Sequence, residues 1–302
     1  MRQRLWTWAL PALALWLSTA GCGEPEAHWS ARASELQPTL SSLDFELLLD
    51  NGDAATVYLP TGPGPESADE RLPVVVHLQG GSVDAQHYAG FGRTLAQAGF
   101  AVIVPNHLRV LGAPGSPPSP LTEGQVVAAA LRGLSRAAEP AGSFLRARID
   151  LDRIAVTGHS FGGVVGLYTV AGLCMAPFCT PPLLRPPLRA AAFFGTHLVR
   201  DGKAEVPAMQ GVPVALLAGL QDGRALPDQI RATYDRLSGP RSLIRIDGVN
   251  HYGITDSNPP AGATPETRTQ TREQGQGVRL IARAVAAFLA PYLRHVPPTP
   301  LD

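Results

Sequence analysis

The stretch Ile154–Gly163, IAVTGHSFGG, decides the fold, because a run of strand formers there meets a serine flanked by glycines. Gly158–Gly162 fits the pattern G-x-S-x-G, and a helical pattern follows. In a strand-turn-helix context this pattern places the serine on a sharp turn, with its hydroxyl exposed at the carboxyl edge of a sheet. Gly158 and Gly162 leave room for the neighbouring strand and helix. We therefore predict that Ser160 is a nucleophile; a serine capping an ordinary helix is the alternative.

Apolar runs and helical patterns alternate along most of the chain. Continuous apolar runs lie at residues 73–78, 99–105, 154–157, 190–194, 212–217 and 243–246, and helical patterns at 86–98, 123–138, 162–173, 227–237 and 271–293. Runs without polar alternation are typical of parallel strands covered on both faces. The chain therefore predicts an α/β fold, a mostly parallel doubly wound sheet with helices on both faces. An Asn-Gly pair between Phe45–Leu49 and Ala55–Leu59 predicts an antiparallel hairpin that opens it.

The N-terminus has the features of an export signal. Arg2 and Arg4 precede the apolar run Leu5–Leu17, and small residues follow at 18–21. This layout is typical of a secretory signal peptide rather than a membrane span. Cys22 resembles the lipidated cysteine of bacterial lipoproteins, so the sequence predicts a cell-envelope protein attached to a membrane through that residue. Plain secretion, as a soluble or periplasmic protein, and an uncleaved anchor are the alternatives.

These features divide the chain into four parts. We expect a signal peptide at residues 1–21, a tether at 22–40, a single domain at 41–296 and a tail at 297–302. The 25 basic and 25 acidic residues balance, and no basic run occurs, so a nucleic-acid partner is not expected. In an exported protein, Cys174 and Cys179 are expected to form a small disulfide, with two independent thiols as the alternative. No His-Cys cluster indicates a metal site.

A nucleophilic serine needs a histidine base and an acid that orients it, and in this arrangement the acid precedes the histidine in the chain. Asp222 follows the apolar run 214–218 and a glycine, which predicts the acid; an Asp-Gly surface turn is the alternative. Asp201 and Asp247 are rivals. Of the histidines after Ser160, which are His197, His251 and His295, only His251 follows the last strand. His251 is therefore the predicted base.

Two backbone N–H groups are expected to bind the oxyanion. One is that of Phe161, directly after the nucleophile. The other is expected from the loop after residues 73–78, which reads Gln79-Gly80-Gly81-Ser82, and we assign it to Gly81. A plain glycine turn is the alternative. His159, inside the motif, is interpreted as a packing residue. Three loops, at residues 111–120, 175–187 and 256–271, are expected near the carboxyl edge of the sheet.

From Leu72 to Leu293 the chain resembles the α/β-hydrolase superfamily. GHSFGG and the segment NHYGITD at residues 250–256 are similar to the group that holds dienelactone hydrolases, cutinase-like polyester hydrolases, chlorophyllases and platelet-activating-factor acetylhydrolases. The resemblance implies that Ser160 is nucleophile, Asp222 acid and His251 base, with Phe161 and Gly81 as amide donors. The chain departs from many members at Gln79-Gly80, where they carry His-Gly.

The expected function is hydrolysis of a carboxylic ester through an acyl-enzyme, without a metal or organic cofactor. The substrate would be a small-molecule, lipid or polymer ester. Two alternatives remain open at this point. One is a lipoprotein that binds a ligand on the same fold without catalysis, and the other is an amidase or another acyl-transfer enzyme with the same three residues.

Overall fold

The computed structural model describes residues 28–29, 42–62, 71–110, 116–179 and 186–294. The signal peptide, Cys22 and the tail at 297–302 lie outside the described residues. So do residues 111–115 and 180–185, which belong to two of the three expected rim loops.

The core of the fold is one sheet, in which nine strands pair among the described residues. In spatial order they are β1 (His28–Trp29), β13 (Arg241–Ile246), β12 (Val214–Gly219), β9 (Leu188–Phe194), β8 (Ile149–His159), β4 (Leu72–Leu78), β5 (Ala101–Asn106), β3 (Ala54–Pro60) and β2 (Ser42–Leu48). Strand β3 is antiparallel to β2 and β5, and the other neighbours are parallel. The expected mostly parallel α/β sheet with an opening hairpin is confirmed.

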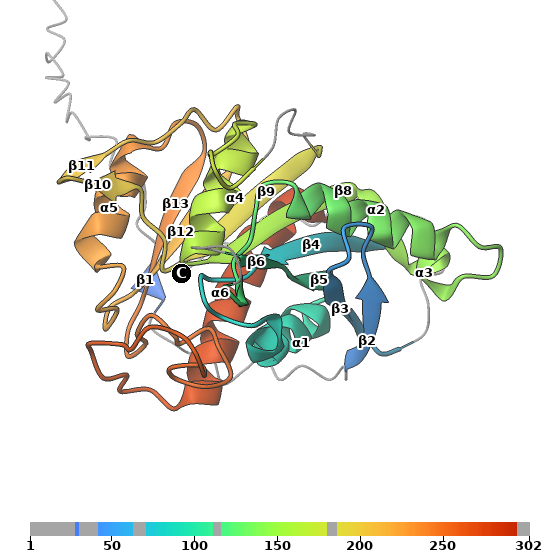
Figure 1. Ribbon diagram of the computed structural model, residues 1–302, viewed down its shortest axis with the longest axis horizontal. Coiled ribbons are helices and arrows are strands. Elements are labelled where there is room, and N and C mark those ends of the chain that lie inside the picture. The colour runs from blue at the N-terminus through green and yellow to red at the C-terminus, as the bar shows by residue number, and fades with distance from the viewer. Residues whose placement is uncertain (1–27, 30–41, 63–70, 111–115, 180–185, 295–302) are drawn as a thin grey trace, which may run out of the picture.

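Helices cover both faces of this sheet (Figure 1). They are the short 3-10 helix η2 (Ala85–Tyr88), α1 (Ala89–Gln97), α2 (Val126–Ala138), α3 (Phe144–Arg148), α4 (Phe161–Ala171), α5 (Pro227–Arg236) and α6 (Gln274–Leu293). Helices α1 and α6 pack on one face, and α2, α3, α4 and α5 on the other. Alternate residues of β4 enter opposite cores: Val74 and Val76 join one, Val75 the other. Burial of both faces is the reason why the strands have no polar alternation.

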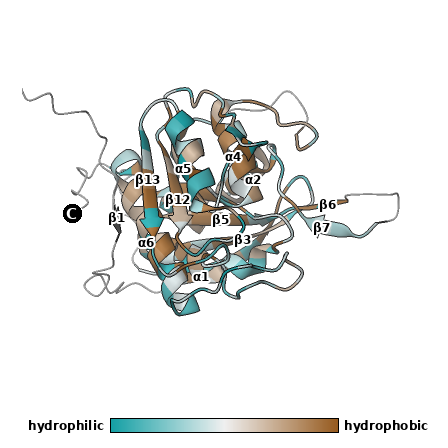
Figure 2. Cartoon of the chain, turned by 90° about the vertical axis from the view of Figure 1, so that its left-hand side faces the viewer, coloured by the Kyte–Doolittle hydropathy of each residue, from teal (hydrophilic) through white to brown (hydrophobic). Residues whose placement is uncertain are grey.

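Some short elements have no sequence signal. Strand β6 (Leu108–Val110) precedes the expected loop at 111–120 and pairs with β7 (Pro118–Pro120) inside it, as an antiparallel ribbon that extends away from the sheet in Figure 2. A second ribbon joins β10 (Val199–Arg200) to β11 (Lys203–Ala204). Strands of two or three residues are too short to show periodicity. Strand β1 lies inside the segment expected as a tether and pairs with Arg245–Ile246 of β13. None of the described helices is long and apolar enough to cross a membrane.

Candidate functional site

Ser160 occupies the turn between β8 and α4 with an unusual backbone. Its φ of 53° and ψ of −119° lie in a region that residues other than glycine rarely adopt. Strand β9 and the turn after it hold this conformation: the Ser160 N–H donates to the carbonyl of Phe194 at 2.9 Å, and the Thr196 hydroxyl donates to the Ser160 carbonyl at 3.1 Å. The strain is thus balanced by hydrogen bonds to the neighbouring strand.

The two glycines of the motif are required by close backbone contacts. A Cβ on Gly158 would lie 2.8 Å from the carbonyl carbon of Gly162. A Cβ on Gly162 would overlap the carbonyl oxygen of Leu78 at the end of β4. The turn therefore closes only without side chains at these two positions, as the G-x-S-x-G pattern predicts.

Ser160, His251 and Asp222 form a continuous hydrogen-bonded row. His251 lies beyond β13, and its Nε2 is 2.8 Å from the Ser160 Oγ. Its Nδ1 is 2.9 Å from Oδ2 of Asp222, which follows β12. Asp222 is fully buried, and its other oxygen accepts the N–H groups of Arg224 at 2.8 Å and Ala225 at 2.7 Å. The carboxylate is thereby fixed in orientation, and it in turn holds Nδ1 of His251 as the protonated nitrogen.

The rival residues are not part of this row. His197 is close by, but its Nδ1 accepts the N–H of Val199 at 3.2 Å rather than contacting the serine. Asp201 and Asp247 are exposed to solvent. His295 lies outside the described residues.

Glu266, which no sequence motif indicates, supports the backbone of the histidine loop. Its Oε2 accepts the N–H of His251 at 3.0 Å, and its Oε1 accepts those of Thr267 and Arg268 at 2.6 and 3.1 Å. Asn250 also donates to the carbonyl of Arg268 at 3.0 Å. The expected rim loop at 256–271 therefore holds the His251 loop in place. No local pattern marks Glu266 for this role.

The two expected oxyanion donors lie next to each other. A Cβ built on Gly81 would lie 3.6 Å from the Cβ of Phe161, whose N–H is the first amide of α4. Among the described residues, neither N–H group has a hydrogen-bond acceptor. The adjacent Gln79 is buried and ties the loop to the end of β5, because its amide accepts the N–H of His107 at 2.8 Å and donates to the carbonyl of His107 at 3.1 Å.

Tyr88 and His159 connect this glycine loop to the histidine loop. The Gly80 N–H donates to the Tyr88 Oη at 2.8 Å, and that Oη lies 2.9 Å from Nδ1 of His159. Nε2 of His159 lies 2.9 Å from the carbonyl oxygen of His251. A carbonyl only accepts, so Nε2 carries the proton and Nδ1 accepts from Tyr88. His159 is buried, as expected of a packing residue, but it is also a hydrogen-bonded link between two loops of the site.

Burial keeps this link uncharged. The pKa of His159 is well below its usual value, chiefly because the ring is fully buried and secondarily because it lies near His251. Burial also raises the pKa of Tyr88. Both groups are therefore neutral near pH 7. The donor and the acceptor of each hydrogen bond in the link from Gly80 to His251 are thereby determined.

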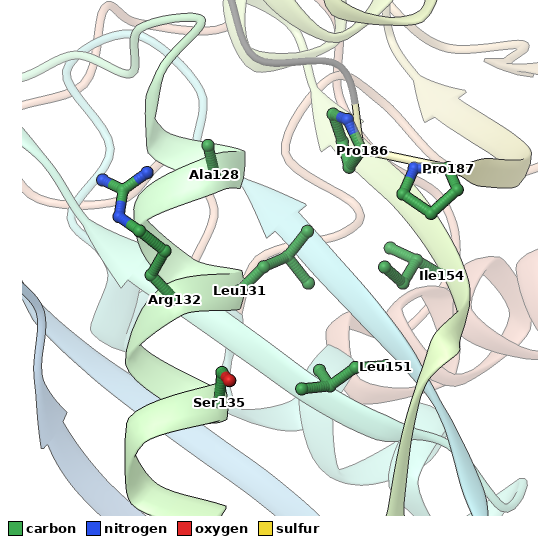
Figure 3. Close-up of a pocket in the computed structure, with 8 residues that line it drawn as sticks. All are labelled: Ala128, Leu131, Arg132, Ser135, Leu151, Ile154, Pro186 and Pro187. Carbon is green, nitrogen blue, oxygen red and sulfur yellow. The ribbon is translucent and has the colours of Figure 1, made fainter.

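A cavity of about 240 Å³ opens beside Ser160. It is lined by Ser160, Phe161, Val164, Gly195, His197, Arg224, Ala225 and His251. A second cavity, of about 310 Å³, lies between α2 and β8 (Figure 3). Leu131 of α2 and Leu151 and Ile154 of β8 line it, with Arg132 and Ser135 on the helix.

The loop between the two cysteines contacts the residue that follows the nucleophile. Cys174 and Cys179 are at disulfide distance, with their Cα atoms 5.5 Å apart. Their loop carries Phe178, whose ring centroid is 4.8 Å from that of Phe161. The Arg109 guanidinium lies over the Phe178 ring, 5.2 Å from its centroid. The cysteine loop therefore places an aromatic ring against the residue that follows the nucleophile.

The chain matches no model of a known protein family, and no curated protein matches it. The geometry of the site and the motif around Ser160 are therefore the basis for assigning a function.

Proposed function

We propose that the protein is a serine hydrolase of carboxylic esters, built on an α/β-hydrolase fold. The observation that carries the proposal is the row in which Ser160 Oγ lies 2.8 Å from His251 Nε2 and His251 Nδ1 lies 2.9 Å from Asp222. These separations allow proton transfer from the serine to a base whose orientation is fixed by a buried acid. The nucleophile also lies on a strained turn that exposes its hydroxyl to a cavity.

The reaction proceeds in two acyl transfers. In the first, His251 removes the hydroxyl proton of Ser160 while the Ser160 Oγ forms a bond to the ester carbonyl carbon. The bond to the alcohol oxygen then breaks, and the alcohol leaves with the proton from His251. In the second, His251 takes a proton from water, the hydroxide oxygen bonds to the acyl carbon, and the bond to Ser160 breaks with return of that proton. Asp222 stabilises the charged imidazole in both halves.

Charge that develops on the carbonyl oxygen needs donors that are already in place. The N–H groups of Phe161 and Gly81 are assigned to this role. They lie on adjacent segments and have no acceptor among the described residues, so they remain available to the oxyanion. The helix α4 directs its N-terminal end toward the same position and favours negative charge there. Donors of this kind contribute about 3 kcal/mol each to transition-state stabilisation.

The setting of the enzyme is inferred from its N-terminus. We propose that it is exported and attached to a membrane of the cell envelope by lipid on Cys22. The substrate is a small-molecule ester, or an ester group of a lipid or polymer that reaches the site. The cavity of about 240 Å³ favours a short acyl or alcohol group beside Ser160.

Covalent labelling with a fluorophosphonate, followed by peptide mass spectrometry, tests the assignment directly. We expect the label on Ser160, and turnover of nitrophenyl esters that is lost in Ser160→Ala. Ser135→Ala is the matched control, since Ser135 lines the second cavity. It should keep both labelling and turnover. Absence of label on the folded wild-type protein, or wild-type turnover by Ser160→Ala, would reject the proposal.

A further inference from the structure

The cavity beside Ser160 contains two basic side chains that the acyl-transfer steps do not use. His197 and Arg224 both line it, together with the nucleophile. They come from different strand ends, His197 after β9 and Arg224 after β12. An ester hydrolase that acts on uncharged esters has no need of a cation beside its nucleophile, since a positive charge there opposes formation of the imidazolium on His251.

Arg224 carries a charge that no described carboxylate neutralises. Its backbone is anchored, because its N–H donates to Asp222 at 2.8 Å. Its side chain is exposed, and Nη1 donates to the carbonyl of Pro265 at 3.2 Å. That bond uses one of several guanidinium donors, and no ion pair to Arg224 forms within the described part of the chain. The other guanidinium N–H groups belong to a side chain that lines the cavity, so they are available to a ligand there.

His197 adds a neutral donor. Its Nδ1 accepts the N–H of Val199 at 3.2 Å, so the proton lies on Nε2. Partial burial lowers the pKa of the ring, with Asp222 opposing and His251 adding to the shift. The ring is therefore uncharged near neutral pH. Nε2 has no acceptor among the described residues.

The acidic groups near the cavity are already engaged. Asp222 is bonded to His251 and to two backbone amides. Glu266 accepts the N–H groups of His251, Thr267 and Arg268. These bonds occupy the carboxylate oxygens, and neither carboxylate forms an ion pair with Arg224 among the described residues. Charge-assisted hydrogen bonds from a guanidinium are the strong ones, and carboxylate and phosphate oxygens are their usual acceptors.

We infer that the cavity binds an ester that carries an anionic oxygen group close to the scissile carbonyl, with Arg224 as its charged partner and the Nε2–H of His197 as a second donor. The inference deepens the proposed function and rests on it. The limited volume of about 240 Å³ places the anionic group within a few bonds of the reacting carbon, as in half-esters of short dicarboxylic acids.

Matched substrates of equal size provide the test. The nitrophenyl half-ester of glutaric acid is compared with the nitrophenyl ester of glutaramic acid, in which a neutral amide replaces the carboxylate. A phosphonate analogue of the same length identifies which anion is preferred. Turnover by Ser160→Ala is subtracted as background. We expect wild-type kcat/KM to favour the carboxylate or the phosphonate by about tenfold or more, the size of one charge-assisted hydrogen bond.

The ratio of the two kcat/KM values is the decisive readout, because a purely structural role of Arg224 would change both substrates alike. Arg224→Gln should reduce the ratio to about one, and Arg224→Lys should retain part of it, as a charge without the fork geometry does. His197→Gln should reduce it less. Arg236→Gln, a matched change at an exposed residue of α5, should keep the wild-type ratio. A wild-type ratio near one, or an unchanged ratio in Arg224→Gln, rejects the anion site. Absence of turnover on both substrates rejects the proposed function instead.

Discussion

The two cavities described above, both among the described residues, differ in chemistry far more than in size. The larger, of about 310 Å³, lies between α2 and β8 and is mainly apolar (Figure 3). Its arginine, Arg132, is paired with Asp50 at 3.2 Å, and its serine, Ser135, is on a regular helix. The smaller, of about 240 Å³, is lined by Ser160, which has a φ of 53° and whose hydroxyl is hydrogen-bonded to His251. Volume alone therefore does not mark the candidate site. Its marks are the strained backbone of Ser160 and the buried acid that is hydrogen-bonded through both oxygens.

The largest effect on kcat is expected from a substitution of the buried acid at the smaller cavity. Asp222→Asn removes the charge that holds Nδ1 of His251 protonated, so kcat on a nitrophenyl ester should fall by about 10⁴-fold. Asp247→Asn, a change at an exposed rival of the same type, should leave kcat unchanged. Circular dichroism of both variants checks that they fold. Near-wild-type kcat in Asp222→Asn would show that the row of residues at the smaller cavity does not carry the reaction.

A smaller effect is expected from the link behind the site. Tyr88→Phe leaves the Gly80 N–H and Nδ1 of His159 without partners, so the two loops that carry Gly81 and His251 lose a fixed spacing. We expect kcat to fall by about tenfold with less change in KM, and unfolding free energy to fall by about 1–3 kcal/mol.

Tyr58→Phe is the control for that experiment, because Tyr58 is a buried tyrosine on β3, away from the site. It should lower stability without lowering kcat. If Tyr88→Phe behaves in the same way as Tyr58→Phe, the link contributes to folding alone and does not position the reacting groups.

The smallest effect on activity is expected at the larger cavity. Leu131→Ala removes a half-buried side chain from its wall, so the unfolding free energy should fall by about 1 kcal/mol. Turnover of nitrophenyl esters should stay within about twofold, which is the scatter expected of a change remote from the reacting atoms. A tenfold loss of kcat/KM at unchanged stability would show that both cavities serve the same reaction, and the contrast between them would fail.

The strands and the nucleophile turn are the parts that local patterns predict well. The apolar runs correspond to β4, β5, β8, β9, β12 and β13, because each strand must bury both faces. The opening hairpin follows from its Asn-Gly turn. The structure also brings together the three residues expected from the motif and from their order in the chain. Elements of two or three residues, such as β6 and β7, could not be predicted from the sequence, since they are too short to show a hydrophobic period.

The sequence by itself determined the mostly parallel sheet, the strand-turn-helix around Ser160, and the candidate acid and base after two later strands. All of these depend on neighbours in the chain, which impose periodicity and turn geometry. Only the tertiary structure decided that Tyr88 lies against His159, that Glu266 holds the His251 loop, and that Arg224 and His197 share the cavity of Ser160. Tyr88 and His159 are 71 residues apart, and His159 and His251 92. Contacts over such separations arise from packing of whole elements, which no local propensity encodes.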